Sequence, residues 1–281
     1  MMKRVGEDIL CGAVNSQRQC WDNERVDDSG VVYCKTCGEP KTFLRESPFE
    51  PKRMLMLTIM CRCEREREAD ARAQEQREEA NRRLQALRTA SLMGERTQKS
   101  RFENWRSNGV NDKLRTICER YVANWPQLRA RNKSLLLHGP SGSGKTFAAA
   151  CIGNALIEHG VPVLMVSLVQ LLHETERRGT DFAEAMRFAE LLILDDLGAD
   201  RGTDTATERV FAVIDARYRQ GKPMVITSNL TTNEIQSADV GRRRIFDRLG
   251  EDCVPVSVAG YNWRGQKARE DWDWTKAMLG I

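Results

Sequence analysis

The sequence contains no long apolar run. No stretch approaches the roughly 20 consecutive apolar residues that a membrane helix needs, so we expect no membrane span and no membrane partner. Residues 1–14 include Glu7 and Asp8, at positions where a secretory signal peptide would be apolar. These two absences together predict a cytoplasmic protein.

Aromatic residues are also few, at 6% of the 281 residues, whereas 30% of the residues are charged. This composition predicts a water-soluble chain with room for one large domain, or for one medium-sized domain and a small one. The net charge of +4 is mildly basic, which permits nucleic-acid binding without requiring it.

Without an export signal, the nine cysteines favour free thiols or a metal site over disulfides. Cys11 and Cys20 lie in a polar, weakly periodic segment and are interpreted as free thiols.

The remaining cysteines of the N-terminal part form two close pairs. Cys34 and Cys37 make a C-x-x-C motif followed by Gly38, and Cys61 and Cys63 make a C-x-C motif. Four thiolates can surround one Zn²⁺ tetrahedrally, which leaves no open position and predicts a structural site. Because about 30 residues cannot build a core, the metal would supply much of the folding energy. Reduced structural cysteines are the alternative; a redox role is disfavoured because no thioredoxin-like βαβ pattern surrounds the motif.

Residues 64–88 contain neither glycine nor proline and are rich in Glu, Arg, Ala and Gln. Glu–Arg pairs four residues apart, such as Glu68 and Arg72, favour a solvated charged helix that links two domains. A coiled coil is disfavoured because the apolar a/d seam is missing. We expect a flexible joint at residues 93–100, where this segment ends.

From residue 101 onward, apolar strands alternate with helices. We expect strands at 133–138, 161–166, 191–195, 223–229 and 254–258, and helices at 111–125, 146–159, 168–178, 182–190, 205–219 and 241–249. Such alternation predicts an α/β fold with a parallel sheet covered by helices on both faces.

Residues 139–146 fit the phosphate-loop pattern G-x-x-x-x-G-K-[ST]. They are Gly139, Pro140, Ser141, Gly142, Ser143, Gly144, Lys145 and Thr146. The glycines let successive N–H groups point at one anion, and the following helix adds its positive N-terminus. Lys145 can then reach the β- and γ-phosphates of a nucleotide, and the Thr146 hydroxyl can bind Mg²⁺. A chance Gly/Ser-rich turn is disfavoured by the expected strand before it and helix after it.

Two acids and an amide follow two of the expected strands. Asp195 and Asp196 end an apolar strand, where a carboxylate would lie beside the phosphate loop. We expect Asp195 to hold Mg²⁺ and Asp196 to orient or deprotonate the attacking water. Asn229 ends another strand and could position the same water. The plainer interpretations are a strand-end turn for the acids and a turn or helix cap for Asn229.

Arginines complete the set of candidate site residues. Arg244 and Arg248 share a face of a basic helix, which is usually a solvated face. Nucleotide hydrolysis, however, often uses an arginine from a neighbouring subunit. Arg264 follows Tyr261 and Trp263 and is a second candidate, supplied by the same subunit.

The order of these motifs, together with 215–218 (DARY), 225–230 (VITSNL) and 244–249 (RIFDRL), resembles the AAA+ ATPases of the DnaC/DnaI helicase-loader and IstB transposition-helper group. The resemblance covers residues 101–270 and implies ATP hydrolysis with Mg²⁺. It implies the following roles: Walker A for Lys145 and Thr146, Walker B for Asp195 and Asp196, sensor 1 for Asn229, trans arginine finger for Arg248, and sensor 2 for Arg264. The second acid is Asp rather than the usual Glu, which suggests slow hydrolysis.

The resemblance also implies a division of the chain and a function. Residues 1–63 would form a zinc-binding, helicase-interaction module, 64–100 a charged helical linker, and 101–281 the AAA+ ATPase domain. The implied function is to load the replicative hexameric helicase onto single-stranded DNA, as the helicase loaders of bacteria and their phages do. It includes self-assembly into a ring or spiral. The alternatives are an IstB-like helper of a DNA transposase, a small-molecule kinase, and an interaction protein with a vestigial nucleotide site.

Overall fold

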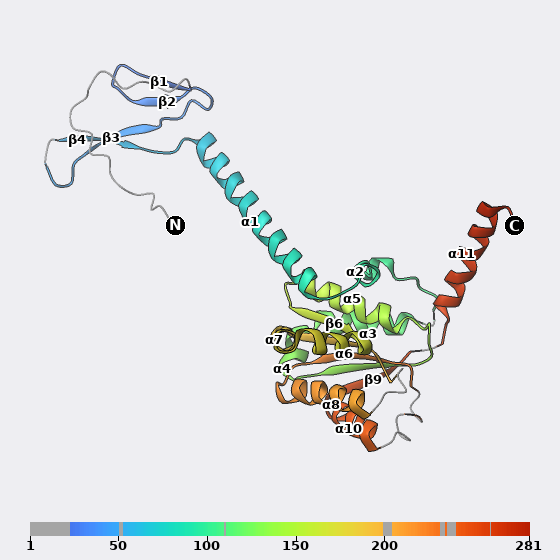
Figure 1. The fold of residues 1–281 in the computed structure, drawn as a ribbon. Helices are drawn as coiled ribbons and strands as arrows, with labels where there is room; N and C mark the ends of the chain where they lie inside the picture. The colour runs from blue at the N-terminus through green and yellow to red at the C-terminus, as the bar shows by residue number, and fades with distance from the viewer. Residues whose placement is uncertain are drawn as a thin grey trace. The chain divides into compact units, whose positions relative to one another are not determined.

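The computed structural model describes residues 23–50, 53–109, 111–198, 204–230, 234, 240–258 and 260–281 (Figure 1). Cys11 and Cys20 lie outside these residues. Contacts divide the chain into two compact units, Met1–Ala80 and Asn81–Ile281. Among the described residues, none of the helices combines the length and apolar character that a membrane crossing requires.

The first unit contains two small antiparallel hairpins. Strands β1 (Glu24–Val26) and β2 (Val32–Cys34) form one, and β3 (Thr42–Glu46) and β4 (Met54–Thr58) form the other. The Val32 N–H donates to Thr42 Oγ1 at 2.8 Å and so ties the two hairpins together. The fully buried side chains described in this unit are few: Val32, Cys34, Thr42 and Cys61. Two of these four are cysteines, so the thiols form a large part of a very small core.

Helix α1 (Arg62–Ala90) confirms the charged helix expected at 64–88, and none of its residues is buried. The expectation of a flexible joint at 93–100 is wrong. Met93 is buried, and the short helix α2 (Glu95–Gln98) follows it. Asn154 in the core helix α5 (Lys145–Glu158) donates its amide to the carbonyls of Thr97 and Ser100, both at 2.8 Å. The segment is held in place because a buried amide needs these acceptors.

The second unit is built on a five-stranded parallel sheet of order β6-β7-β8-β5-β9, which confirms the predicted α/β class. The strands are β5 (Ser134–His138), β6 (Val163–Ser167), β7 (Leu191–Leu197), β8 (Met224–Ser228) and β9 (Cys253–Ser257). Alternate residues of each strand enter two separate cores: Leu135 and Leu137 face one core, and Leu136 faces the other.

Helices cover both faces of this sheet. The first core is closed by α5 and by α3 (Asp112–Ala123) and α4 (Trp125–Ala130), with the 3₁₀ turn Phe102–Asn104 at its edge. The second core is closed by α6 (Leu168–Arg178), α7 (Thr180–Phe188), α8 (Asp204–Arg219) and α10 (Val240–Asp252). A last helix, α11 (Trp263–Leu279), was not expected from the sequence, and none of its residues is buried.

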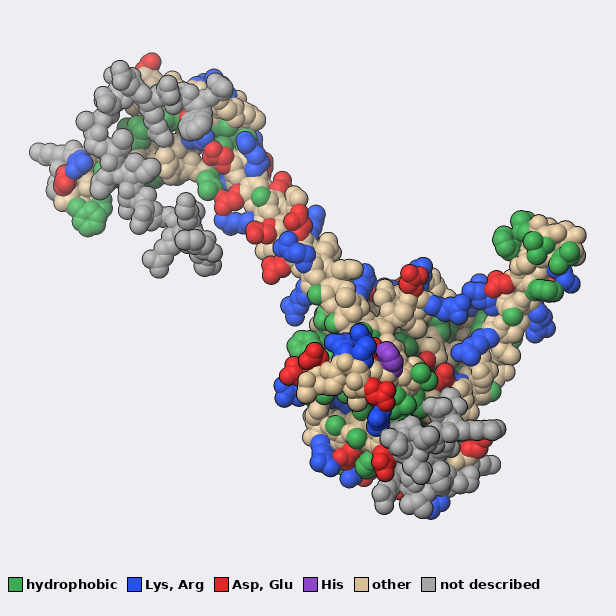
Figure 2. All heavy atoms as spheres, in the orientation of Figure 1, with side chains coloured by type: hydrophobic (Ala, Val, Ile, Leu, Met, Phe, Trp, Pro, Cys, Tyr) green, Lys and Arg blue, Asp and Glu red, His purple; other side chains and the backbone are tan. Residues whose placement is uncertain are grey.

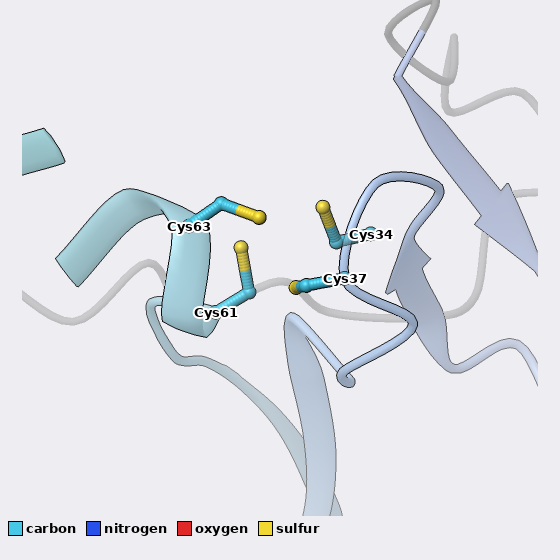
Figure 3. A group of neighbouring side chains, drawn as sticks. All are labelled: Cys34, Cys37, Cys61 and Cys63. Carbon is cyan, nitrogen blue, oxygen red and sulfur yellow. The ribbon is translucent and has the colours of Figure 1, made fainter. Parts of the chain in front are cut away.

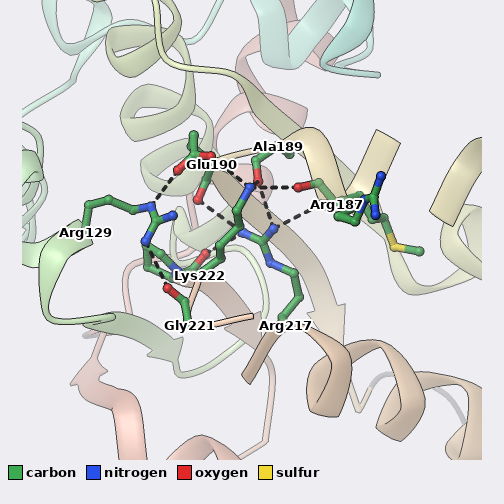
Figure 4. A network of polar contacts seen from close by, with 9 residues as sticks. Arg129, Arg187, Ala189, Glu190, Arg217, Gly221 and Lys222 are labelled. Carbon is green, nitrogen blue, oxygen red and sulfur yellow. Dashed lines mark hydrogen bonds and ion pairs between the residues drawn. The ribbon is translucent and has the colours of Figure 1, made fainter. Parts of the chain in front are cut away.

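A polar network fixes the starts of β7 and β8 (Figure 4). The Arg217 side chain on α8 is 1% exposed and donates to four backbone carbonyls. These belong to Met186, Ala189, Glu190 and Pro223. The Glu190 carboxylate also pairs with Arg129 at 2.6 Å and with Lys222 at 2.8 Å. The strands that carry Asp195 and Asn229 at their far ends are therefore anchored at their near ends.

Candidate nucleotide-binding site and metal centre

The phosphate loop joins β5 to α5, as the sequence predicts. Gly139, Gly142 and Gly144 have φ values of 148°, 81° and 96°, which favour glycine. A Cβ on Gly139 would lie 2.4 Å from the Val258 carbonyl oxygen, and one on Gly142 would lie 2.3 Å from Asn262 Oδ1. The first two glycines are therefore required by close neighbours as well as by backbone conformation.

The Lys145 side chain is drawn into this loop and is only 4% exposed. Its ammonium donates to the carbonyls of Gly139 and Pro140, both at 2.8 Å. Burial lowers the pKa of Lys145, Arg264 acts in the same direction, and Asp196 opposes the change. A phosphate in the loop would supply the negative charge that this partly desolvated cation lacks.

The acid that ends the apolar part of β7 meets the start of α5. Thr146 Oγ1 donates to the Asp195 carboxylate, 2.9 and 3.1 Å from its two oxygens. Thr227, on the neighbouring β8, donates to the same carboxylate at 2.6 Å. Burial raises the pKa of Asp195, while the hydrogen bonds from Thr227 and Thr146 oppose that rise. A hydroxyl and a carboxylate are oxygen groups of the kind that Mg²⁺ binds, so these residues fit the ion.

The second acid is positioned by an irregularity in the sheet. Pairing between β7 and β8 shifts between Leu194 and Leu197, and Asp196 has a φ of 61°. A bulge of this kind re-aims side chains, and here Asn229 Nδ2 donates to Asp196 Oδ1 at 3.0 Å. The Asp196 N–H donates to Thr227 Oγ1 at 2.9 Å. The structure thus brings Asp195, Asp196 and Asn229 together, with Thr227 between them.

The segment after β9 lies against the phosphate loop. The Trp263 N–H donates to the Gly142 carbonyl at 3.0 Å, and Arg264 Nη1 lies 3.4 Å from Ser141 Oγ. Asn262 contacts Gly142 and also caps α11 by accepting from the Gly265 N–H at 2.9 Å. Arg264 therefore lies beside the loop, where sequence reasoning placed it. Asn262 was missed, although a polar residue directly before a tryptophan-rich helix is a recognisable N-cap signal.

Arg248 lies elsewhere in the single chain. Its guanidinium is 4.9 Å from the centre of the Tyr218 ring and pairs with Asp215 at 3.6 Å and with Glu251 at 3.7 Å. Tyr218 also hydrogen-bonds to Glu251 through its hydroxyl. These partners hold Arg248 on the surface formed by α8 and α10. The role of Arg248 as an arginine finger would be exerted on the ATP of a neighbouring subunit, and this role stays a prediction.

The four predicted metal ligands converge in the first unit (Figure 3). Their Sγ atoms all lie within 4.8 Å of one another. Cys34 and Cys37 flank the turn after β2, and Cys61 and Cys63 lie at the start of α1. Zn–S bonds of about 2.3 Å separate sulfurs of a tetrahedral site by about 3.8 Å, so small side-chain movements would complete it.

The thiols of this cluster differ in acidity. The backbone N–H groups of Glu39 and Cys63 lower the pKa of Cys37 to about 6. A hydrogen bond from the Cys63 thiol to Cys37 raises the pKa of Cys63 to about 12, and burial and the repulsion between two neighbouring thiolates act in the same direction. A divalent cation relieves that repulsion, so the donor set fits Zn²⁺.

A phosphate loop, a strand-end acid facing its threonine, and a five-stranded parallel sheet flanked by helices define an AAA+ type of P-loop nucleotide-binding protein. Residues 69–271 match the family described as IstB-like ATP binding protein. The chain belongs to this family, whose description includes ATP binding.

Several known proteins are similar to this chain. The phage-like element PBSX protein XkdC of Bacillus subtilis (strain 168) is 28% identical over 199 residues, which cover 65% of this chain and 74% of that protein. The replicative helicase loader DnaI of Bacillus subtilis (strain 168) is 26% identical over 150 residues, 48% of each chain. The crystal structure of the DnaC helicase loader superposes with a TM-score of 0.52 at 22% identity, covering 59% of this chain and all of that one. This last likeness concerns the fold, and it confirms the AAA+ core predicted from the sequence.

Proposed function

We propose that this protein is an ATP-hydrolysing loader of a replicative hexameric DNA helicase onto single-stranded DNA. The observation that carries the proposal is the occurrence of two sites in one chain. One is a phosphate loop whose Thr146 faces Asp195, and the other is a separate four-thiol cluster. The similarity to DnaI supports the same conclusion.

ATP is the proposed substrate of the first site. The loop N–H groups and Lys145 bind its phosphates, and Thr146 with Asp195 would hold Mg²⁺, which neutralises phosphate charge when bound. Asp196, held by Asn229, orients the attacking water or accepts its proton. The site is completed by two arginines, Arg264 from the same subunit and Arg248 from a neighbour.

The proposed division of labour follows the order of the chain. Residues 1–63 bind zinc and dock on the helicase, and residues 101–281 hydrolyse ATP. Residues 64–100 link these two parts of the chain. The boundary between the two compact units lies within α1, which is part of the linking segment. A nucleotide shared head-to-tail between subunits gives a ring or an open spiral. Such a spiral can follow single-stranded DNA through basic residues that contact its phosphates.

The first experiment is native mass spectrometry of the full chain mixed with a hexameric replicative helicase, ATP and Mg²⁺. We expect a stable complex that is lost when residues 1–63 are deleted. Lys145→Ala should abolish ATP binding, whereas Lys113→Ala, which removes an exposed lysine, should leave it intact. Failure of the full chain to bind any replicative helicase would contradict the loader proposal.

A subunit-mixing experiment tests the proposed place of Arg248. Arg248→Ala should keep ATP binding and lose hydrolysis, while Arg219→Ala removes an exposed arginine that also pairs with Asp215 and serves as the control. A mixture of Lys145→Ala and Arg248→Ala chains should regain activity, because one interface then combines an intact loop with an intact arginine. Normal hydrolysis by Arg248→Ala alone would remove the residue from this role.

The second candidate is an IstB-like helper of a DNA transposase, and the family description favours it. It shares the ATP site, so the four-thiol unit and the DNA substrate separate the two functions. ATP-dependent filaments on duplex DNA, seen by electron microscopy, together with no helicase complex, would support the helper function.

A further inference from the structure

The second half of α11 and the chain end after it carry a cluster of large, exposed apolar side chains. Its members are between 55% and 75% exposed: Trp272, Trp274, Met278, Leu279 and Ile281. Figure 2 shows hydrophobic side chains gathered at this end of the chain. Exposed apolar side chains concentrated in this way mark an interaction surface more often than scattered single ones do.

The cluster divides into two faces of the helix. Trp274 and Met278 are spaced i and i+4 in α11, so they share one face, and Ile281 follows the left-handed C-cap Gly280 at the end of the helix. Trp272 and Leu279 are seven residues apart and share the opposite face. Asp271 lies seven residues before Met278 and therefore flanks the first face with a negative charge. The first face has the anchor spacing of a helix that binds in a groove.

A groove with matching properties lies between α7 and α8 of the same unit. It forms an open hollow of about 510 Å³ whose exposed wall surface is mostly apolar, although polar and charged residues line it too. The apolar lining residues are Ala183, Met186, Ala212, Val213 and Ala216. Small side chains on both helices leave room for large ones from a partner, and the volume is typical of a site that accepts large apolar groups. Arg187 also lines the hollow and carries positive charge. Glu184 lines it with the opposite charge, and Arg209 is paired with Glu176.

We propose that α11 of one copy of this chain binds in the α7–α8 groove of a second copy. Trp274 and Met278 enter the apolar hollow, and Asp271 lies beside Arg187 at its rim. A second copy is the occupant because α11 leaves the domain on the side away from α7, as Figure 1 shows. The chain's own groove is thus out of reach of its own α11.

The proposed contact rests on, and extends, the head-to-tail assembly through the ATP site. Helix α11 begins at the phosphate loop, where the Trp263 N–H binds the Gly142 carbonyl. Its 17 residues extend about 26 Å at 1.5 Å per residue. On the neighbour, Arg248 of α10 contacts Asp215 and Tyr218 of α8. The subunit that brings Arg248 to the ATP would therefore also bring its α8, within reach of a helix of this length.

Sedimentation velocity of the full chain with ATP and Mg²⁺ tests the contact. The double variant Trp274→Ser/Met278→Ser should weaken self-association by at least about tenfold, since buried aromatic anchors dominate such interfaces. The matched control, Trp272→Ser/Leu279→Ser, removes the same kind of surface from the opposite face and should assemble as the wild type does. In the groove, Ala216→Glu should act as the first double variant does, and Ala183→Glu provides a second groove variant on α7. Both alanines are exposed, so neither change disturbs the core.

Mixing the variants distinguishes a directed contact from general stickiness. The Trp274→Ser/Met278→Ser chain keeps its groove and the Ala216→Glu chain keeps its α11, so an equimolar mixture should form dimers that do not grow further. A wild-type chain that remains monomeric, equal weakening by both double variants, or no heterodimer in the mixture would overturn the proposal. Helicase binding and ATP affinity are measured on the same variants. If the variants keep normal helicase binding and ATP affinity and also assemble as the wild type does, the α11 contact is disproved while the loader function stands.

Discussion

The buried Arg217 allows a quantitative test of how the nucleotide-binding unit is held together. The substitution Arg217→Met keeps a long side chain in the same space and removes every donor. Four backbone carbonyls lose the hydrogen bond from Arg217: those of Met186, Ala189, Glu190 and Pro223. Ala189 and Pro223 each keep one longer bond, at 3.4 Å, from Lys222 and from the Leu192 N–H. Because these carbonyls surround the starts of β7 and β8, the loss should act on the free energy of unfolding of the whole sheet.

Two opposing contributions set the size of the effect. Hydrogen bonds from a charged donor contribute about 1.5 kcal/mol each at the lower end of their range, so four of them contribute about 6 kcal/mol. Against this, burial lowers the pKa of the Arg217 guanidinium to about 10, which corresponds to about 3 kcal/mol of cost for keeping the charge buried. The difference predicts that Arg217→Met lowers the free energy of unfolding by about 3 kcal/mol.

Urea unfolding followed by tryptophan fluorescence measures this change. With a slope of about 2 kcal/mol per molar urea, the midpoint should fall by about 1.5 M. Arg120→Met, which removes an exposed arginine from α3, is the matched control and should leave the midpoint unchanged. ATP affinity of the folded Arg217→Met fraction should equal that of the wild type, since the residue lies at the opposite end of the strands. A loss below about 1 kcal/mol would refute the argument that these bonds outweigh the cost of the buried charge.

Three further predictions concern the sites. Burial raises the pKa of Asp195, so the folded state holds the proton more tightly and loses stability as the pH rises from the unfolded pKa to the raised one. Asp195→Asn should therefore raise the melting temperature at neutral pH while weakening Mg²⁺-dependent ATP binding; an unchanged or lower melting temperature would contradict this. Cys34→Ser, or treatment with a chelator, should release about one zinc per chain by elemental analysis and reduce helicity from the first turns of α1, while ATP binding in the second unit persists. Asn262→Ala should cost about 1 kcal/mol through loss of the α11 cap and weaken ATP binding severalfold in calorimetric titrations, and Asn262→Asp should restore the cap; equal affinity for all three proteins would disprove the link between the cap and the loop.

The parallel sheet could be predicted from the sequence because each strand is a short apolar run between turn residues. The expected helix 168–178 coincides with α6, and the strand expected at 223–229 contains β8. Helix α11 was missed because its apolar residues face no core, so no single apolar stripe appears in its sequence. The flexible joint was predicted at 93–100 because Gly94 and the polar residues around it suggest flexibility, and this prediction was wrong. The acceptors that Asn154 needs are visible only in three dimensions.

The site shows the same distinction between local and through-space information. The phosphate loop and the two acids follow from spacing along the chain. The role of Thr227 does not follow from the sequence, because it depends on β8 lying next to β7 at a bulge. Its hydroxyl accepts from the Asp196 N–H and donates to Asp195, so one side chain orients both acids. Replacement by valine would keep the shape and lose both hydrogen bonds, which separates this polar role from packing.

Helix α8 connects the features that depend on one another in the proposed assembly. Arg217 anchors its C-terminal part to the base of the sheet, and Asp215 and Tyr218 hold Arg248 of α10 on its surface. Ala216 lies between them in sequence and lines the groove. A partner helix that binds in this groove would therefore contact the same turn that restrains the arginine. Since an arginine that serves a neighbour's ATP must leave Asp215 and Tyr218, occupation of the groove and release of Arg248 would be coupled, and disruption of either should weaken both assembly and hydrolysis.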